Sequence, residues 1–272
     1  MINTTTNSLM RCLVLLIAAF SIATLFNTTF VLADTKNNAV LQELMLIFTA
    51  DYGQGEQVYS SNFANDSWTV PLQLSDSLIH AFHPVVAVGD DNYKWAVWTQ
   101  VDENGKYLYY SVFNGVAWSK GKRISTQTTE NSSPALMVNG KQNLLLAWVG
   151  VDDKYSDVYL SHWQGSTWTK PVMINAVNNV PDIKPYFSRN MNNRIVLSWL
   201  TFIDGKYAVT ARILDDEQRV IAKLPLSEKI TSSNVHKRVK LPALPEFVKD
   251  VKKGSFFIKT SAGSASASLS DY

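Results

Sequence analysis

The 272-residue chain carries 25 lysine and arginine residues against 23 aspartate and glutamate residues, and it is 46% hydrophobic and 11% aromatic with a single cysteine. This balance of charge, without a basic motif, argues against a nucleic-acid ligand, and one cysteine cannot build a disulfide framework. The charge is uneven along the chain: residues 34–227 hold 16 basic and 19 acidic side chains, whereas residues 228–272 hold 8 and 4.

The N-terminus has the pattern of a cleaved export signal. Residues 12–26 form an apolar run after Arg11, and small residues precede Asp34. The run is shorter than the roughly 20 apolar residues that a membrane span needs, although a membrane anchor is the alternative reading. We therefore predict a signal peptide over residues 1–33 and a secreted or periplasmic protein without a transmembrane span in its mature form. Cleavage would also remove Cys12, which excludes a cysteine-ligated metal.

Tryptophan recurs at intervals of about fifty residues in two contexts. One series follows Phe48 with Trp98, Trp148 and Trp199; the other consists of Trp68, Trp118 and Trp168. A repeat of this length is one supersecondary unit that buries its apolar faces only by stacking on its neighbours. The first series lies in runs that are apolar at consecutive positions, which predicts strands buried on both faces. The second series is expected to wedge between units, with stacking against sugars as the alternative.

Each repeat divides into four short strands. In the second repeat we expect strands over residues 84–88, 93–101, 106–113 and 118–125, with Pro84 opening the first of them. Asn-Gly pairs mark the hairpin turns, and Asn65 stands where later repeats have Gly115 and Gly165. Asparagine accepts a left-handed backbone more readily than other non-glycine residues, so the turn geometry is expected to persist.

These features predict an all-β chain, namely a β-propeller of about four four-stranded antiparallel blades over residues 34–228. The blades form either a four-bladed ring or an open array. The first repeat lacks an opening strand, which residues 254–260 can supply. The rest of residues 229–272 is a basic and then Ser/Ala-rich tail.

The segments 61–68, 111–118 and 161–168 share the pattern Ser-x-aromatic-x-Asn/Gly-x-x-Trp. This pattern resembles the sialidase-type bacterial neuraminidase repeat, or Asp-box, in which the third position is aspartate. Here Phe63, Phe113 and Trp163 replace that aspartate. The resemblance implies a propeller whose repeat turns lie at one face. The family's arginine triad and Tyr–Glu nucleophile pair have no evident counterparts among the arginines and acids of this chain.

Polar side chains are expected to gather at the opposite face, where the hairpins between second and third strands meet the loops between blades. The candidate ligand-binding residues on this rim are Asp102, Asp152, Asp153, Asp204, His83, Glu130 and Asp182. Such oxygens suit sugar hydroxyls or Ca²⁺, but aspartate is also common in hairpin turns for its own sake. The motifs predict no other cofactor and no zinc site, since His80 and His83 have no third ligand.

We therefore predict an exported binding module that recognises a glycan or a protein partner. One alternative is a degenerate sialidase-like glycoside hydrolase, and another is a scaffold subunit that a partner chain completes.

Overall fold

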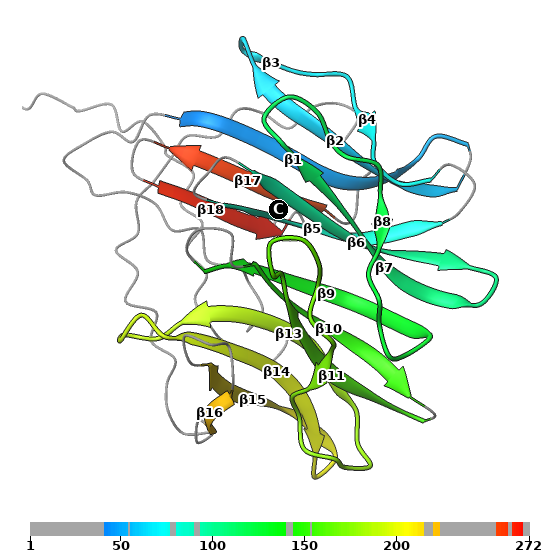
Figure 1. The fold of residues 1–272 in the computed structure, drawn as a ribbon, viewed down its shortest axis with the longest axis vertical. Helices are drawn as coiled ribbons and strands as arrows, with labels where there is room; N and C mark the ends of the chain where they lie inside the picture. The colour runs from blue at the N-terminus through cyan, green and yellow to red at the C-terminus, as the bar shows by residue number, and fades with distance from the viewer. Residues whose placement is uncertain are drawn as a thin grey trace, which may run out of the picture.

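The computed structural model describes residues 41–53, 55–76, 80–89, 93–139, 144–152, 154–214, 220–223, 254–260 and 263–268. All regular secondary structure within these ranges is β-strand (Figure 1). The predicted signal peptide, residues 1–33, and the basic segment 229–253 lie outside the described residues.

The strands group into four units that follow the repeats. Unit 1 contains β1 (Leu41–Asp51), β2 (Glu56–Ala64), β3 (Ser67–Trp68), β4 (Leu72–Gln73), β17 (Gly254–Thr260) and β18 (Gly263–Ser268). Unit 2 contains β5 (Ala81–Val88), β6 (Lys94–Asp102), β7 (Gly105–Phe113) and β8 (Lys122–Arg123). Unit 3 contains β9 (Glu130–Val138), β10 (Leu144–Asp152), β11 (Tyr155–His162) and β12 (Val172–Met173). Unit 4 contains β13 (Asp182–Arg189), β14 (Ile195–Ile203), β15 (Lys206–Leu214) and β16 (Val220–Lys223).

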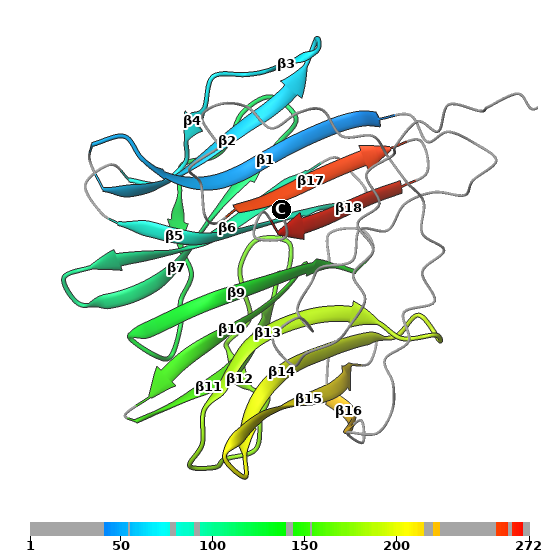
Figure 2. The ribbon, with the colours of Figure 1, turned by 180° about the vertical axis from the view of Figure 1, so that it is seen from behind.

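Within units 2 to 4 the strands pair antiparallel in chain order, as predicted, whereas in unit 1 the sheet order is β18-β17-β1-β2-β3. One parallel bridge, Lys106 with Glu130, joins the sheets of units 2 and 3 into a single path. The units follow one another along the long axis of the molecule, and the first strands β5, β9 and β13 lie beside one another in succession (Figures 1 and 2). The all-β class and the antiparallel sheets are thus confirmed, while closure into a ring stays a prediction.

Unit 1 takes its first strand from the far end of the chain. β17 pairs antiparallel with β1, with Leu44 opposite Ile258 and Phe48 opposite Gly254. Both views show β17 and β18, in red, beside the blue β1 (Figures 1 and 2). The segment 254–260 therefore occupies the place of the opening strand that the first repeat lacks.

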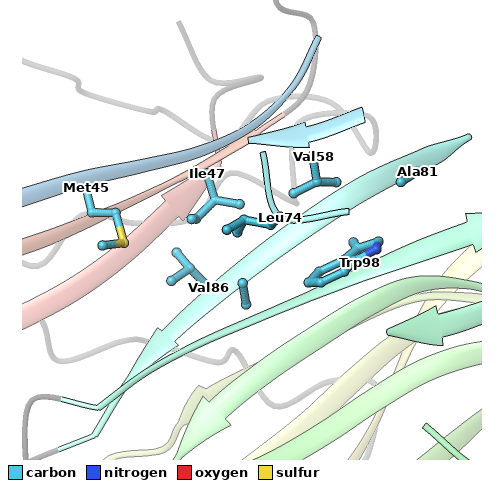
Figure 3. Packing of buried hydrophobic residues seen from close by; sticks show 8 residues of the cluster. Met45, Ile47, Val58, Leu74, Ala81, Val86 and Trp98 are labelled. Atoms are coloured by element: carbon cyan, nitrogen blue, oxygen red, sulfur yellow. The ribbon is translucent and has the colours of Figure 1, made fainter. Parts of the chain in front are cut away.

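Apolar side chains fill the space between consecutive units. Neighbouring residues of one strand serve opposite faces: Trp98 packs with residues of unit 1, whereas Val97 packs with Leu146 and Trp148 of unit 3. The seam between units 1 and 2 gathers Met45 and Ile47 of β1 into one cluster with Val86 of β5 and Trp98 of β6 (Figure 3). This alternation explains why the second strand of each unit is apolar at consecutive positions, and it confirms burial on both faces.

Two members of the second tryptophan series, Trp118 and Trp168, also pack between units. Trp118 lies against the seam of units 1 and 2, and Trp168 of unit 3 lies 6.2 Å from the ring of Trp95 of unit 2. In each repeat turn the aromatic residue in the place of the Asp-box aspartate meets the tryptophan edge-on or tilted, with 5.5 Å between ring centroids. The aromatic substitution thus contributes packing at the turn.

Hydroxyl groups tie the same turns together. The Ser111 hydroxyl donates to the carbonyl oxygen of Ser119 at 2.7 Å, and the Ser119 hydroxyl accepts the amide of Val112 at 3.1 Å. Units 1 and 3 repeat this pattern with Ser61 and Thr69 and with Ser161 and Thr169. Asn65, Gly115 and Gly165 all have positive φ, as the asparagine-for-glycine exchange predicts. We call this face of the molecule the turn edge.

The prolines do not open their strands, contrary to the sequence-based expectation. β5 begins three residues before Pro84, and a β-bulge places His83 and Pro84 opposite Trp98. The residue before each proline has a left-handed φ of 50–52° at His83, Ser133 and Lys184. The bulge frees the proline from the ladder hydrogen bond that it cannot donate, so proline is tolerated inside these strands.

The outer strands are shorter than predicted. Instead of a strand over 118–125, unit 2 has an isolated bridge between Phe113 and Trp118 and the two-residue β8. The intervening residues serve the turn hydrogen bonds described above, which draw the chain away from a regular ladder.

Candidate functional site

The hairpins between second and third strands meet the inter-unit linkers at one edge of the molecule, which we call the loop edge. Antiparallel pairing requires this, because the start of each first strand lies opposite the end of the second: Ala81 faces Gln100, Glu130 faces Val151 and Asp182 faces Thr201. The loop edge therefore carries the ends of β1, β6, β10 and β14 together with the linkers that precede β5, β9 and β13.

Hydrogen bonds connect several of these loops to one another. The amide of Val101 donates to the carbonyl oxygen of His80 at 2.9 Å. The amide of Phe202 donates to the carbonyl oxygen of Pro181 at 3.0 Å. Between units 2 and 3, the Lys106 ammonium lies 2.7 Å from Glu130, and its amide donates to Thr129. These contacts hold the hairpins of units 2 and 4 together with the linkers that precede β5, β9 and β13.

The candidate Asp102 and the hairpin aspartate of unit 1, Asp51, hold their own turns. Asp102 Oδ1 accepts the amide of Asn104 at 2.8 Å, and Asp102 Oδ2 lies 3.8 Å from Arg123. Asp51 Oδ1 accepts the amides of Gly53 and Gly55 in the same way. These bonds match the turn role that was the alternative to ligand binding for such aspartates.

The other candidates occupy different places on or near the edge. Asp152 ends β10 at the hairpin of unit 3, and Asp204 lies exposed in the unit 4 turn with a left-handed φ of 49°. Glu130 is engaged with Lys106. His83 lies in the β5 bulge, and Asp153 lies outside the described residues.

Asp182 is fully buried, at 0% exposure, at the seam between units 3 and 4. Its Oδ1 accepts the indole N–H of Trp199 at 2.7 Å and the hydroxyl of Thr201, and its Oδ2 accepts the amides of Asn175 and Asn178 at 3.0 and 3.1 Å. Four donors on one carboxylate offset the cost of burying its charge.

A second carboxyl, Asp157, shares the Asn175 amide with Asp182. Asn175 Nδ2 lies 2.7 Å from Asp157 Oδ1 while also donating to Asp182. Burial raises the pKa of the Asp157 carboxyl above its usual range, the Asn175 hydrogen bond opposes this, and the charges of Asp182 and Asp152 add to it. The pairing of Asp157 with Asp182 through one amide joins the third strand of unit 3 to the first strand of unit 4.

Sequence reasoning also missed a tyrosine at every hairpin of the loop edge. These residues are Tyr52, Tyr107, Tyr155 and Tyr207. They do not share one register, since only Tyr107 and Tyr207 are a whole number of repeats apart, so a search by period passes over the other two. Their position close to the hairpin aspartates in the sequence was the signal that could have identified them.

Among the described residues no group of three or more His, Cys, Asp or Glu side chains is arranged to hold a metal ion. In the same part of the chain no helix has the length and apolar character of a membrane span.

No protein-family model matches the chain, and no curated protein sequence matches it. Among solved structures, a protein of unknown function from Dyadobacter fermentans is similar at 11% identity and a TM-score of 0.49, over 89% of this chain and 97% of that one. An endo-arabinase from Bacteroides thetaiotaomicron is similar at 12% identity and a TM-score of 0.45, over 88% and 96% of the two chains. An α-L-arabinofuranosidase from Podospora anserina is similar at 12% identity and a TM-score of 0.44, over 72% and 67%. These similarities identify no site residue in the present chain.

Proposed function

We propose that the protein is an exported binding module that recognises a glycan through its loop edge. The observation that carries this proposal is the set of hydrogen bonds from hairpin to linker, which holds the loops of units 2 and 4 at this edge. A preorganised surface loses little conformational freedom on binding, and carboxylates beside tyrosines suit a ligand rich in hydroxyls.

A glycan array probed with residues 34–272 tests the proposal. We expect binding to a subset of glycans, weakened when Asp102, Asp152 and Asp204 are changed together to alanine. Asp66→Ala is the control, because Asp66 is an exposed aspartate at the turn edge. Equal losses in both variants, or binding to no glycan while a protein partner is captured, would contradict glycan recognition at this edge.

Export belongs to the same proposal, with the predicted signal over residues 1–33 as its basis. N-terminal sequencing of the protein from culture supernatant or periplasm should start at Asp34. Retention of the full chain in the cell would contradict export.

A glycoside hydrolase is the second candidate, and Asp157 is the observation that favours it. A half-buried carboxyl with a raised pKa next to a second carboxylate has the property that a general acid requires. Turnover of nitrophenyl glycosides that disappears in Asp157→Asn would establish catalysis. Turnover unaffected by this change would remove the role of Asp157.

A further inference from the structure

The four hairpin tyrosines of the loop edge differ in what covers their rings. The guanidinium of Arg123 lies 3.3 Å from the ring centroid of Tyr107, which is 5% exposed. The ammonium of Lys154 lies 5.1 Å from the ring centroid of Tyr155. In unit 4, Phe202 meets Tyr207 edge-on at 5.2 Å. Tyr52 of unit 1, in contrast, is 54% exposed.

Tyr52 is nevertheless held in place by a series of aromatic contacts. The buried rings of Phe48 and Tyr59 stack at 5.7 Å, and Tyr52 meets Tyr59 edge-on at 4.9 Å. Burial of part of the side chain raises the pKa of Tyr52, in agreement with this anchoring. The ring is therefore both exposed and oriented by the core.

The backbone around Tyr52 is fixed as well. Asp51 Oδ1 accepts the amides of Gly53 and Gly55 at 2.8 and 3.0 Å. Across the hairpin, the exposed His80 lies so close to Gly55 that a β-carbon at that position would be 2.6 Å from its Cε1 atom. A hydrogen-bonding imidazole thus lies beside the hairpin that presents the tyrosine.

We propose that Tyr52 is the stacking platform of a saccharide subsite, with the His80 imidazole as a hydrogen-bonding partner for a sugar hydroxyl. The flat ring accepts the apolar C–H face of a neutral pyranose, whereas the cations over Tyr107 and Tyr155 obstruct the equivalent approach. Asp51 acts as a positioning residue that holds the turn. This inference depends on the proposed glycan recognition and adds a subsite on unit 1 to the loop edge that the proposal describes.

Titration of residues 34–272 with the best-bound neutral oligosaccharide from the array tests the subsite. We expect Tyr52→Ala to weaken affinity by about tenfold and Tyr52→Phe to remain within about threefold of the unchanged protein, because stacking needs the ring and not the hydroxyl. Tyr93→Ala is the matched control, since Tyr93 is 41% exposed and lies by the β5–β6 turn at the turn edge. Thermal unfolding of each variant establishes that it is folded.

The outcomes separate the two proposals. If the unchanged protein binds a sugar and Tyr52→Ala binds it equally well, the subsite is overturned and glycan recognition stands. If Tyr52→Phe loses as much affinity as Tyr52→Ala, the stacking role is overturned. If the unchanged protein binds no sugar in the array, both proposals are overturned. Dependence of a captured protein partner on Tyr52 would overturn the saccharide assignment.

Discussion

Trp98, Trp148 and Trp199 hold the same place in three units, but their indole N–H groups donate to different acceptors. Trp148 donates to Asn131 at 2.9 Å and Trp199 to Asp182, both from the start of the first strand. In unit 2 that position is Ala81, and Gln100 accepts the bond at 3.1 Å instead.

The residue two positions after each tryptophan differs between units, according to where the acceptor for the indole N–H comes from. Unit 2 has the long side chain of Gln100, and unit 3 has Gly150, where a β-carbon would lie 2.6 Å from the hydroxyl oxygen of Thr128. That hydroxyl donates to Asn131, so Gly150 leaves room for the acceptor of Trp148. In unit 1 the core aromatic is Phe48, which has no N–H group. The buried indole N–H groups of Trp98, Trp148 and Trp199 thus each meet an acceptor, as the cost of an unmade hydrogen bond favours.

This exchange predicts the behaviour of Gln100→Ala. The change leaves the buried indole N–H of Trp98 without its acceptor, and we expect the free energy of unfolding to fall by about 1–3 kcal/mol. Urea denaturation measures the loss. Adding Ala81→Asn should recover part of it, because asparagine supplies the acceptor from that position in unit 3. A double variant no more stable than Gln100→Ala would contradict the exchange.

Asp157 predicts a pH dependence of stability. Because its pKa is raised in the folded state, the carboxyl favours folding when it is protonated, and this contribution is lost as pH rises through the folded-state pKa. Asp157→Asn should therefore unfold at higher urea concentration than the unchanged protein at neutral pH, with the difference shrinking toward pH 4. Denaturation midpoints across pH 4–7.5 measure this, with Asp66→Asn at the turn edge as control. A constant difference between the two proteins over that range would contradict it.

At the level of strands, the sequence predicted their identity better than their ends. The second and third strands of unit 2 lie close to their predicted ranges, because a continuous apolar run and the Asn104-Gly105 turn mark them. The first strands begin earlier than predicted because a bulge admits proline to the strand interior. The propensity of a single residue does not predict such a bulge, because the bulge involves the pairing of two strands and lies opposite a tryptophan of the second strand.

The candidate site was predictable in its location but not in its contacts. The hairpin aspartates indicated the loop edge, yet the four donors around Asp182 come from two separate segments, β14 and the linker before β13. The difference in exposure between Tyr52 and the other hairpin tyrosines also depends on side chains that the fold brings beside each ring. A repeat pattern shows which residues the units have in common. It does not show which side chains of one unit contact those of the next.

The bulges predict a response to glycine. Ser133 has a φ of 50°, and a non-glycine residue in the left-handed region is strained by roughly 1–2 kcal/mol. Ser133→Gly removes that strain, partly offset by the greater backbone freedom of glycine when unfolded, so we expect stability to rise by up to about 1 kcal/mol. Ser132→Gly is the control: Ser132 precedes the bulge in the same strand, and its change should destabilise. Thermal or urea unfolding that ranks the two variants in the reverse order would contradict the interpretation.

For the molecule as a whole, the pairing of β17 with β1 joins the end of the chain to its first unit. β17 also lies beside β5, the first strand of unit 2, so it contributes to the seam between units 1 and 2 as well.

Removing residues 254–272 would leave the backbone groups of β1 that face β17 unpaired and would expose a sheet edge. We expect the shortened chain to unfold at lower temperature and to self-associate through that edge. Thermal unfolding with light scattering measures both effects, and removal of residues 269–272 alone is the control for truncation, since both paired strands then remain. A chain shortened at residue 253 that stays monomeric with unchanged unfolding would show that β1 does not depend on its partner. Because antiparallel pairing fixes seven residues of β1 against seven of β17, loss of that pairing should reach unit 1 first, so Tyr52 and its aromatic contacts should lose order before the loops of units 3 and 4.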